Sequence, residues 1–150
     1  MRLALSFTLT VLISTQLAAQ SDSRRLVTLD DLHAWKAVSD PQISPEGDWV
    51  AYTVGETDVA GDQEVSDLWM TSWDGATTIR LTASPRASET TPRWSPDGRW
   101  LAFLSSRGDS GDAEQLWLLD RRGGEARKVT EIKTGISEYA WSSDGTRLAF

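Results

Sequence analysis

The residues of this chain that could support catalysis lie in one polar segment and at one upstream position. The segment Gly108-Asp109-Ser110-Gly111 holds a serine in a glycine-rich stretch, and His33 is the single histidine. A serine, an imidazole and a carboxylate within hydrogen-bonding reach form a nucleophilic triad, which attacks acyl groups when an oxyanion hole stands beside it. The residue types for that chemistry are therefore present, with the histidine upstream of the serine.

The setting of these residues argues against a triad. Ser110 falls in a polar loop, and Asp112 stands where chymotrypsin-like peptidases carry another glycine. His33 is predicted to lie on the surface of a short helix. Asp109, Asp112 and Glu114 could surround a calcium ion, but the ordered ligand spacing of a calcium loop is absent. We therefore assign no catalytic, cofactor-binding or metal-binding residue within this chain.

The elements around these residues follow a phrase that occurs three times, at 43–52, 94–103 and 141–150. Each copy has a serine, a turn that ends in Glu-Gly or Asp-Gly, and then an apolar strand. The serines Ser44, Ser95 and Ser142 are 51 and 47 positions apart. The turn residues favour reversal because proline presets φ and glycine accepts positive φ. A period near fifty with strand-turn-strand content is typical of propeller blades.

A second repeated unit lies between the copies and consists of a Leu-Trp strand, a glycine turn and a strand that ends in threonine. Trp69 and Trp117 are 48 positions apart, as are Thr82 and Thr130. Each period therefore predicts four strands, which is one blade of a β-propeller.

We expect an all-β fold, a partial β-propeller of about two and a half four-stranded blades preceded by a short N-terminal helix. Blade 1 is expected over 40–82, blade 2 over 89–130 and the start of blade 3 over 138–150. The longest loops are expected between the second and third strands of a blade, at 55–66 and 107–113. The third copy of the phrase runs to the last residue, so we expect the chain to be a truncated part of a longer protein.

The first 19 residues have the layout of a secretory signal peptide, with Arg2 before an apolar run and small residues at Ala18 and Ala19. That run is shorter than the about 20 residues needed to span a bilayer. We therefore expect cleavage after Ala19, no membrane span afterwards, and a protein that is exported to the periplasm or secreted.

Residues 20–39 are expected to hold a polar leader and a short helix. Thr28 is a suitable N-cap, and the acidic residues that follow it face the positive end of the helix dipole. Leu29, Leu32 and Trp35 recur at three-residue spacing, which places one apolar stripe along this helix.

Composition excludes some classes of partner and chemistry. The formal net charge is −7, which disfavours nucleic acid as a partner, because phosphate contacts need clustered basic residues. The chain has no cysteine, so it can form neither a disulfide nor a lipoprotein anchor. The tryptophans on repeat strands are expected to pack between blades: Trp49, Trp69, Trp94, Trp100, Trp117 and Trp141.

Several segments resemble the start of exported enzymes of the prolyl oligopeptidase family, in the branch of acylaminoacyl-peptidases and dipeptidyl-peptidase-like serine peptidases. The segments are 26–32, 38–52, 67–69, 92–107 and 115–118. The resemblance implies a propeller that caps a C-terminal α/β-hydrolase domain with a Ser-Asp-His triad. In this family the propeller restricts entry, so that only short peptides or N-terminal aminoacyl groups reach the serine.

On this interpretation the catalytic residues lie outside the printed sequence, and the chain alone is expected to be inactive. Peptide substrates would be bound through the missing hydrolase domain, and no cofactor is expected. An alternative is a non-enzymatic periplasmic propeller of the TolB type that acts as a protein-binding platform. The helix followed by Val38-Ser39-Asp40-Pro41 favours the peptidase.

Overall fold

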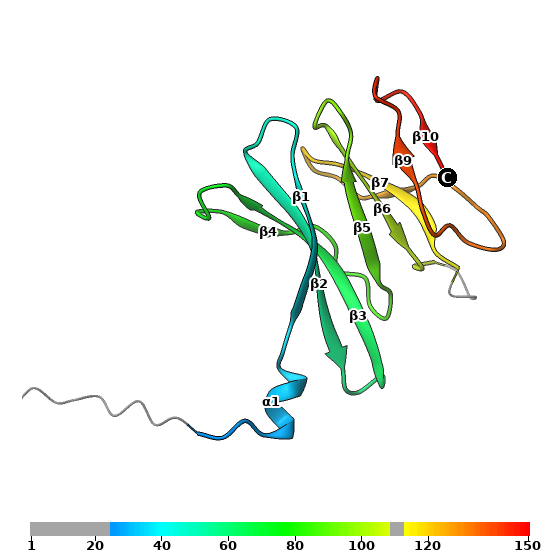
Figure 1. The fold of residues 1–150 in the computed structure, drawn as a ribbon. Coiled ribbons are helices and arrows are strands. Elements are labelled where there is room, and N and C mark those ends of the chain that lie inside the picture. The colour runs from blue at the N-terminus through cyan, green and yellow to red at the C-terminus, as the bar shows by residue number, and fades with distance from the viewer. Residues whose placement is uncertain (1–24, 109–112) are drawn as a thin grey trace, which may run out of the picture.

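The computed structural model describes residues 25–108 and 113–150, which form three antiparallel sheets and one short helix (Figure 1). The expected signal peptide over 1–19 lies outside the described residues, as do Asp109, Ser110 and Asp112. Within the described part of the chain, no helix is long and apolar enough to cross a membrane.

The predicted helix is present as α1, Leu29–His33, and begins where the sequence indicated. Thr28 is extended, with φ −107° and ψ 169°. The Asp31 carboxylate accepts hydrogen bonds from the Thr28 backbone N–H at 2.8 Å and from its hydroxyl at 2.9 Å. These bonds close the first turn of the helix. The helix has no buried residue, so local capping holds it rather than a packed face.

The first two sheets each have four strands in sequence order, which confirms the predicted blades. Their bounds are β1 Ala37–Ile43, β2 Trp49–Asp58, β3 Gln63–Ser72 and β4 Thr78–Arg80, then β5 Glu89–Trp94, β6 Trp100–Ser105, β7 Gln115–Asp120 and β8 Arg127–Lys128. The third sheet pairs β9, Ala140–Trp141, with β10, Leu148–Ala149. The strand β1 begins at Ala37, before the expected blade start at residue 40, because Val38 and Ser39 already pair with Val54 and Thr53.

The expected loop over 55–66 is wrong, because most of it is strand. Pairing between β2 and β3 continues from Gly55 opposite Ser66 to Asp58 opposite Gln63. The connection is therefore only 59–62. Backbone pairing at the solvated end of a hairpin does not require apolar side chains. Part of the second expected loop, 109–112, lies outside the described residues.

The repeated phrase owes its shape to a serine and a glycine in each copy. The serine hydroxyl accepts a hydrogen bond from the backbone N–H five residues later, at 3.1, 2.9 and 3.0 Å for Ser44, Ser95 and Ser142. The glycine takes φ of 83°, 68° and 69° at Gly47, Gly98 and Gly145, a range that side chains disfavour. The same turn therefore joins the first two strands in each of the three sheets.

The first and second sheets share one hydrophobic core, formed by Ala51, Leu68, Met70, Trp94, Leu101, Phe103 and Leu119. A second cluster joins the second sheet to the third and contains Ala102, Leu104, Leu116, Leu118 and Ile136, with Trp141 and Leu148 packed against it. Each sheet is thus covered by its neighbour, as in a propeller.

Most of the repeat tryptophans pack between blades as expected. The Trp94 indole N–H donates to the Gln42 carbonyl at 3.0 Å, and the Trp141 indole N–H donates to the Arg93 carbonyl at 3.2 Å. Trp69 is the exception among the described residues, because it belongs to neither cluster. Its neighbours in β3 face the second sheet, so strand alternation turns Trp69 to the opposite face.

Candidate functional site

The candidate residues that the structure describes do not assemble a catalytic centre. His33 is exposed at the end of α1, as predicted. Glu114 accepts a hydrogen bond from the Thr90 hydroxyl at 3.1 Å, which ties it to β5 of the same sheet. No cluster of three or more potential metal-ligating side chains occurs in the residues described, 25–108 and 113–150.

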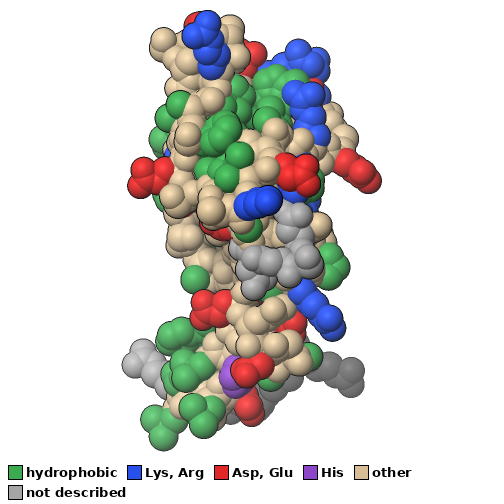
Figure 2. Space-filling view, turned by 90° about the vertical axis from the view of Figure 1, so that its right-hand side faces the viewer, with side chains coloured by type: hydrophobic (Ala, Val, Ile, Leu, Met, Phe, Trp, Pro, Cys, Tyr) green, Lys and Arg blue, Asp and Glu red, His purple; other side chains and the backbone are tan. Residues whose placement is uncertain are grey.

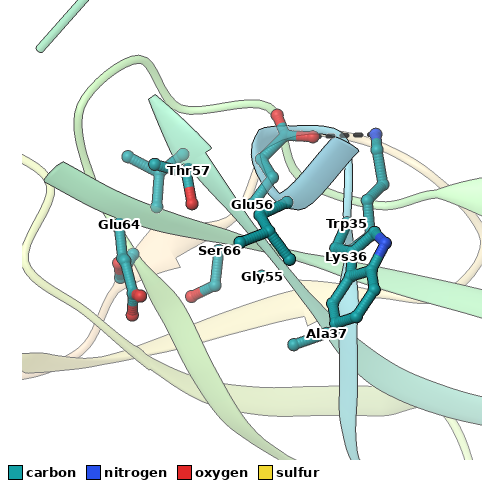
Figure 3. Close-up of a pocket in the computed structure, with 11 residues that line it drawn as sticks. Trp35, Lys36, Ala37, Gly55, Glu56, Thr57, Glu64 and Ser66 are labelled. Carbon is teal, nitrogen blue, oxygen red and sulfur yellow. Dashed lines mark ion pairs between the residues drawn. The ribbon is translucent and has the colours of Figure 1, made fainter. Parts of the chain in front are cut away.

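A cleft of about 360 Å³ lies between α1 and the β2–β3 hairpin (Figure 3). Trp35 and Lys36 border it from the segment after the helix, and Glu56 and Glu64 border it from the hairpin. The Lys36 ammonium donates to Glu56 at 2.7 Å. This hydrogen bond and the lysine charge lower the pKa of Glu56, so the carboxylate stays ionised. The cleft has polar groups for binding but no nucleophile paired with a base.

The helix beside this cleft and the segment after it carry exposed apolar side chains. Leu29, Leu32 and Trp35 are 77%, 44% and 65% exposed. Because α1 ends at His33, Trp35 lies beyond the helix, and the predicted stripe along one helix is only partly formed. Figure 2 shows hydrophobic side chains gathered at the end of the molecule that carries the histidine.

The first strand of each of the first two sheets, β1 and β5, carries a second candidate feature. This feature is a matched pair of bulges. The pairing of β1 with β2 slips between Ser39 and Gln42, and the pairing of β5 with β6 slips between Thr90 and Arg93. A non-glycine residue in each bulge has positive φ, 48° at Asp40 and 56° at Thr91. Such strained residues are uncommon, above all for β-branched threonine. Bulges of this kind redirect side chains out of the regular ladder.

Both bulges make contacts to the next sheet. The Asp40 carboxylate accepts a hydrogen bond from Arg93 Nη1 at 2.7 Å, and the Thr91 carbonyl accepts one from the Tyr139 hydroxyl at 2.5 Å. Burial raises the pKa of Tyr139 far above its usual range, so its hydroxyl remains a donor. Polar contacts thus join β1 to β5, and β5 to the residue directly before β9. Simple strand periodicity does not predict these contacts.

A buried polar network lies at the other end of the second sheet. Glu89 is fully buried and accepts a hydrogen bond from the Ser105 hydroxyl at 3.2 Å. Burial raises the pKa of Glu89. Burial lowers the pKa of Arg107, whose guanidinium carbon lies 4.1 Å from the Trp117 ring centroid. The network is built from residues near strand ends and offers no exposed nucleophile.

No protein-family model matches the chain. A stretch of 125 residues is 42% identical to the uncharacterized peptidase YuxL of Bacillus subtilis, covering 83% of this chain and 19% of that protein. A stretch of 131 residues is 29% identical to dipeptidyl-peptidase 5 of Porphyromonas endodontalis, covering 87% of this chain and 18% of that protein. The chain therefore spans about a fifth of the length of these curated relatives.

Two solved structures share the fold. An acylaminoacyl peptidase of Pyrococcus horikoshii superposes with a TM-score of 0.63 at 23% identity, over 78% of this chain and 17% of that one. A TolB protein of Agrobacterium tumefaciens superposes with a TM-score of 0.56 at 25% identity, over 76% of this chain and 37% of that one. The fold is that of a β-propeller. The chain corresponds to part of the propeller region of peptidases of the prolyl oligopeptidase family, as the resemblance predicted.

Proposed function

We propose that this chain is the propeller part of an exported serine peptidase, in which the propeller restricts access to a nucleophilic serine. The observation that carries this proposal is the 42% identity with a peptidase over 125 residues. Substrates would be short peptides or N-terminal aminoacyl groups, because larger chains would not pass a packed ring of blades. The serine and its partners would lie beyond residue 150.

The structure supports a passive role for these residues in the proposed enzyme. The interblade clusters are closely packed around side chains such as Leu68 and Phe103, both fully buried. Such packing favours a stiff wall over a deformable one. The 150-residue chain by itself is expected to leave aminoacyl and peptidyl nitroanilides unhydrolysed.

The proposal is tested with the protein at its natural length. Hydrolysis of a dipeptidyl nitroanilide is compared with cleavage of the same dipeptide fused to the N-terminus of a folded domain. Restricted access predicts hydrolysis of the small substrate and none of the fusion. Equal cleavage of both would refute the gating role, and cleavage of neither would refute the peptidase.

A second candidate is a non-enzymatic propeller that binds proteins. The superposition on a TolB protein, with a TM-score of 0.56 over 76% of this chain, favours it. The coding sequence that follows residue 150 separates the two candidates. A Gly-x-Ser-x-Gly motif followed by an aspartate and a histidine supports the peptidase, and a further run of blades without that motif supports the binding protein.

Export of the proposed peptidase rests on residues 1–19, which have the layout of a signal peptide. Processing after Ala19 would leave Gln20 as the new N-terminus. Mass spectrometry of protein recovered from outside the cytoplasm should therefore begin the mature chain at Gln20. Mature protein that retains Met1 would contradict export by cleavage.

A further inference from the structure

A cavity of about 320 Å³ lies between β1, β5 and β9, the first strands of the three sheets. Figure 1 shows β1, β5 and β9 following one another across these sheets. The cavity is lined by one strand from each sheet or its flank, including Gln42, Ile43, Arg93, Trp94, Tyr139 and Trp141. Most of these side chains are apolar or aromatic, and Arg93 is the one charged residue among those that line it.

Arg93 is held in place by one of its terminal nitrogens. Nη1 donates to the Asp40 carboxylate at 2.7 Å and to the Pro92 carbonyl at 2.7 Å. Within the described residues, neither Nε nor Nη2 has a hydrogen-bond acceptor. The side chain is 35% exposed, so solvent reaches the guanidinium. These two nitrogens form the edge that binds a carboxylate with two parallel hydrogen bonds.

The aromatic side chains that line this cavity have their polar atoms already paired within the protein. The indole N–H groups of Trp94 and Trp141 donate to backbone carbonyls. The Tyr139 hydroxyl donates to the Thr91 carbonyl. Ile43 remains 59% exposed at the rim. A cavity with aromatic side chains beside a single oriented cation suits a ligand that carries an apolar group and ends in a carboxylate.

The strained bulge in β1 supplies the group that orients the cation. Asp40 has φ of 48°, and it lies opposite Arg93 of the next sheet. Backbone strain of this kind persists where the surroundings enforce it, and it occurs preferentially at ligand sites. The Asp40 charge opposes the binding of an anion, while its hydrogen bond fixes the guanidinium. These two effects can be separated by substitution.

We propose that this cavity binds a carboxylate attached to an apolar group, such as the free C-terminus of a short apolar peptide, on the Nε–Nη2 edge of Arg93. The inference goes beyond the proposed peptidase function and does not require it, because binding is measured without turnover. A protein that lacked peptidase activity could still bind the ligand, so the two proposals fail separately.

The test uses the natural-length protein after treatment with a fluorophosphonate, which blocks a reactive serine where one is present. Equilibrium dialysis compares N-acetyl-phenylalanine with its neutral amide. The acid is expected to bind at least about tenfold more tightly, because only the acid can accept the two charge-assisted hydrogen bonds. Equal binding of acid and amide would overturn the proposal.

Two substitutions locate the site. Arg93→Lys keeps the positive charge but loses the two-nitrogen edge, and should remove most of the preference for the acid. Arg122→Lys is the matched control, because Arg122 pairs with Asp120 at an exposed turn outside the cavity. A preference retained in Arg93→Lys, or lost equally in Arg122→Lys, would place the carboxylate elsewhere and overturn the proposal.

Asp40→Asn gives a result that a purely structural pair would not give. The asparagine amide oxygen can still accept from Nη1, but the negative charge beside the ligand is gone. Binding of the acid should therefore tighten by roughly threefold to tenfold, the effect of removing one like charge at a solvated site. Weaker binding in Asp40→Asn, with circular dichroism unchanged, would mean that the pair serves the fold and not a ligand.

Discussion

Replacing Phe103 by alanine tests whether the first two sheets are held together by their shared cluster. Phe103 lies in β6, is fully buried, and belongs to the cluster that includes Leu68 and Met70 of the first sheet. Truncation of a buried phenylalanine to alanine costs about 3–5 kcal/mol of unfolding free energy, through lost transfer energy and a residual cavity. The Arg107 guanidinium carbon, 5.2 Å from the ring centroid, also loses its aromatic contact.

Urea unfolding of the natural-length protein, followed by tryptophan fluorescence, measures this loss. Trp94 lies in the cluster and Trp117 packs against it, so their emission reports the affected region. With a slope of about 1–3 kcal/mol per molar urea, the midpoint of that transition should fall by roughly 1–5 M. Phe103→Leu should give a smaller fall, because leucine refills part of the cavity.

Trp73→Ala is the matched control, since Trp73 is a large aromatic residue that is 69% exposed. Exposed positions of this kind usually change stability by less than about 0.5 kcal/mol. A midpoint for Phe103→Ala that falls no further than the midpoint for Trp73→Ala would refute the reasoning. It would mean that the two sheets do not depend on this cluster for their association.

Three further predictions concern stability. Burial raises the pKa of Glu89 above its ordinary value. The stability that protonated Glu89 contributes is therefore complete below the ordinary pKa, and it is lost as the pH rises through the folded-state pKa. Glu89→Gln should flatten the resulting decrease in urea midpoint between about pH 4 and pH 7, and a steeper decrease would contradict this. Trp94→Phe removes the hydrogen bond to the Gln42 carbonyl and should cost about 1 kcal/mol, whereas an unchanged midpoint would show that bond to be dispensable. The isolated chain 25–150 leaves apolar groups such as Val38 and Ile43 exposed at 66% and 59%, so it should aggregate or bind a hydrophobic dye; a compact monomer with one cooperative transition would show that the blades are autonomous.

The blades could be predicted from the sequence because their signals are local. The serine that bonds the backbone five residues on, and the glycine at positive φ, act within one turn. The segment 55–66 was misjudged because strand pairing at the solvated end of a hairpin leaves little trace in polarity. That error concerns an element boundary and does not change the fold.

The cavity around Arg93 could not be predicted in the same way, because it depends on contacts between sheets. Asp40 and Arg93 are far apart in the sequence, and their pairing follows from a bulge that no periodicity marks. One signal was available in the sequence. Asp40 lies three residues before the first copy of the repeated phrase, and Arg93 lies directly before the second copy. The serine segment around Ser110 lies outside the described residues, so its interpretation as a loop without catalytic function stays a prediction.

The most direct test of the central claim is to locate the reactive serine in the natural-length protein. The protein is labelled with a fluorophosphonate, digested, and analysed by mass spectrometry, with a denatured sample as control. The account predicts one labelled serine, located beyond residue 150 within a Gly-x-Ser-x-Gly motif. Labelling of Ser110, or no labelling above the denatured control, would contradict the claim that this propeller serves a serine peptidase.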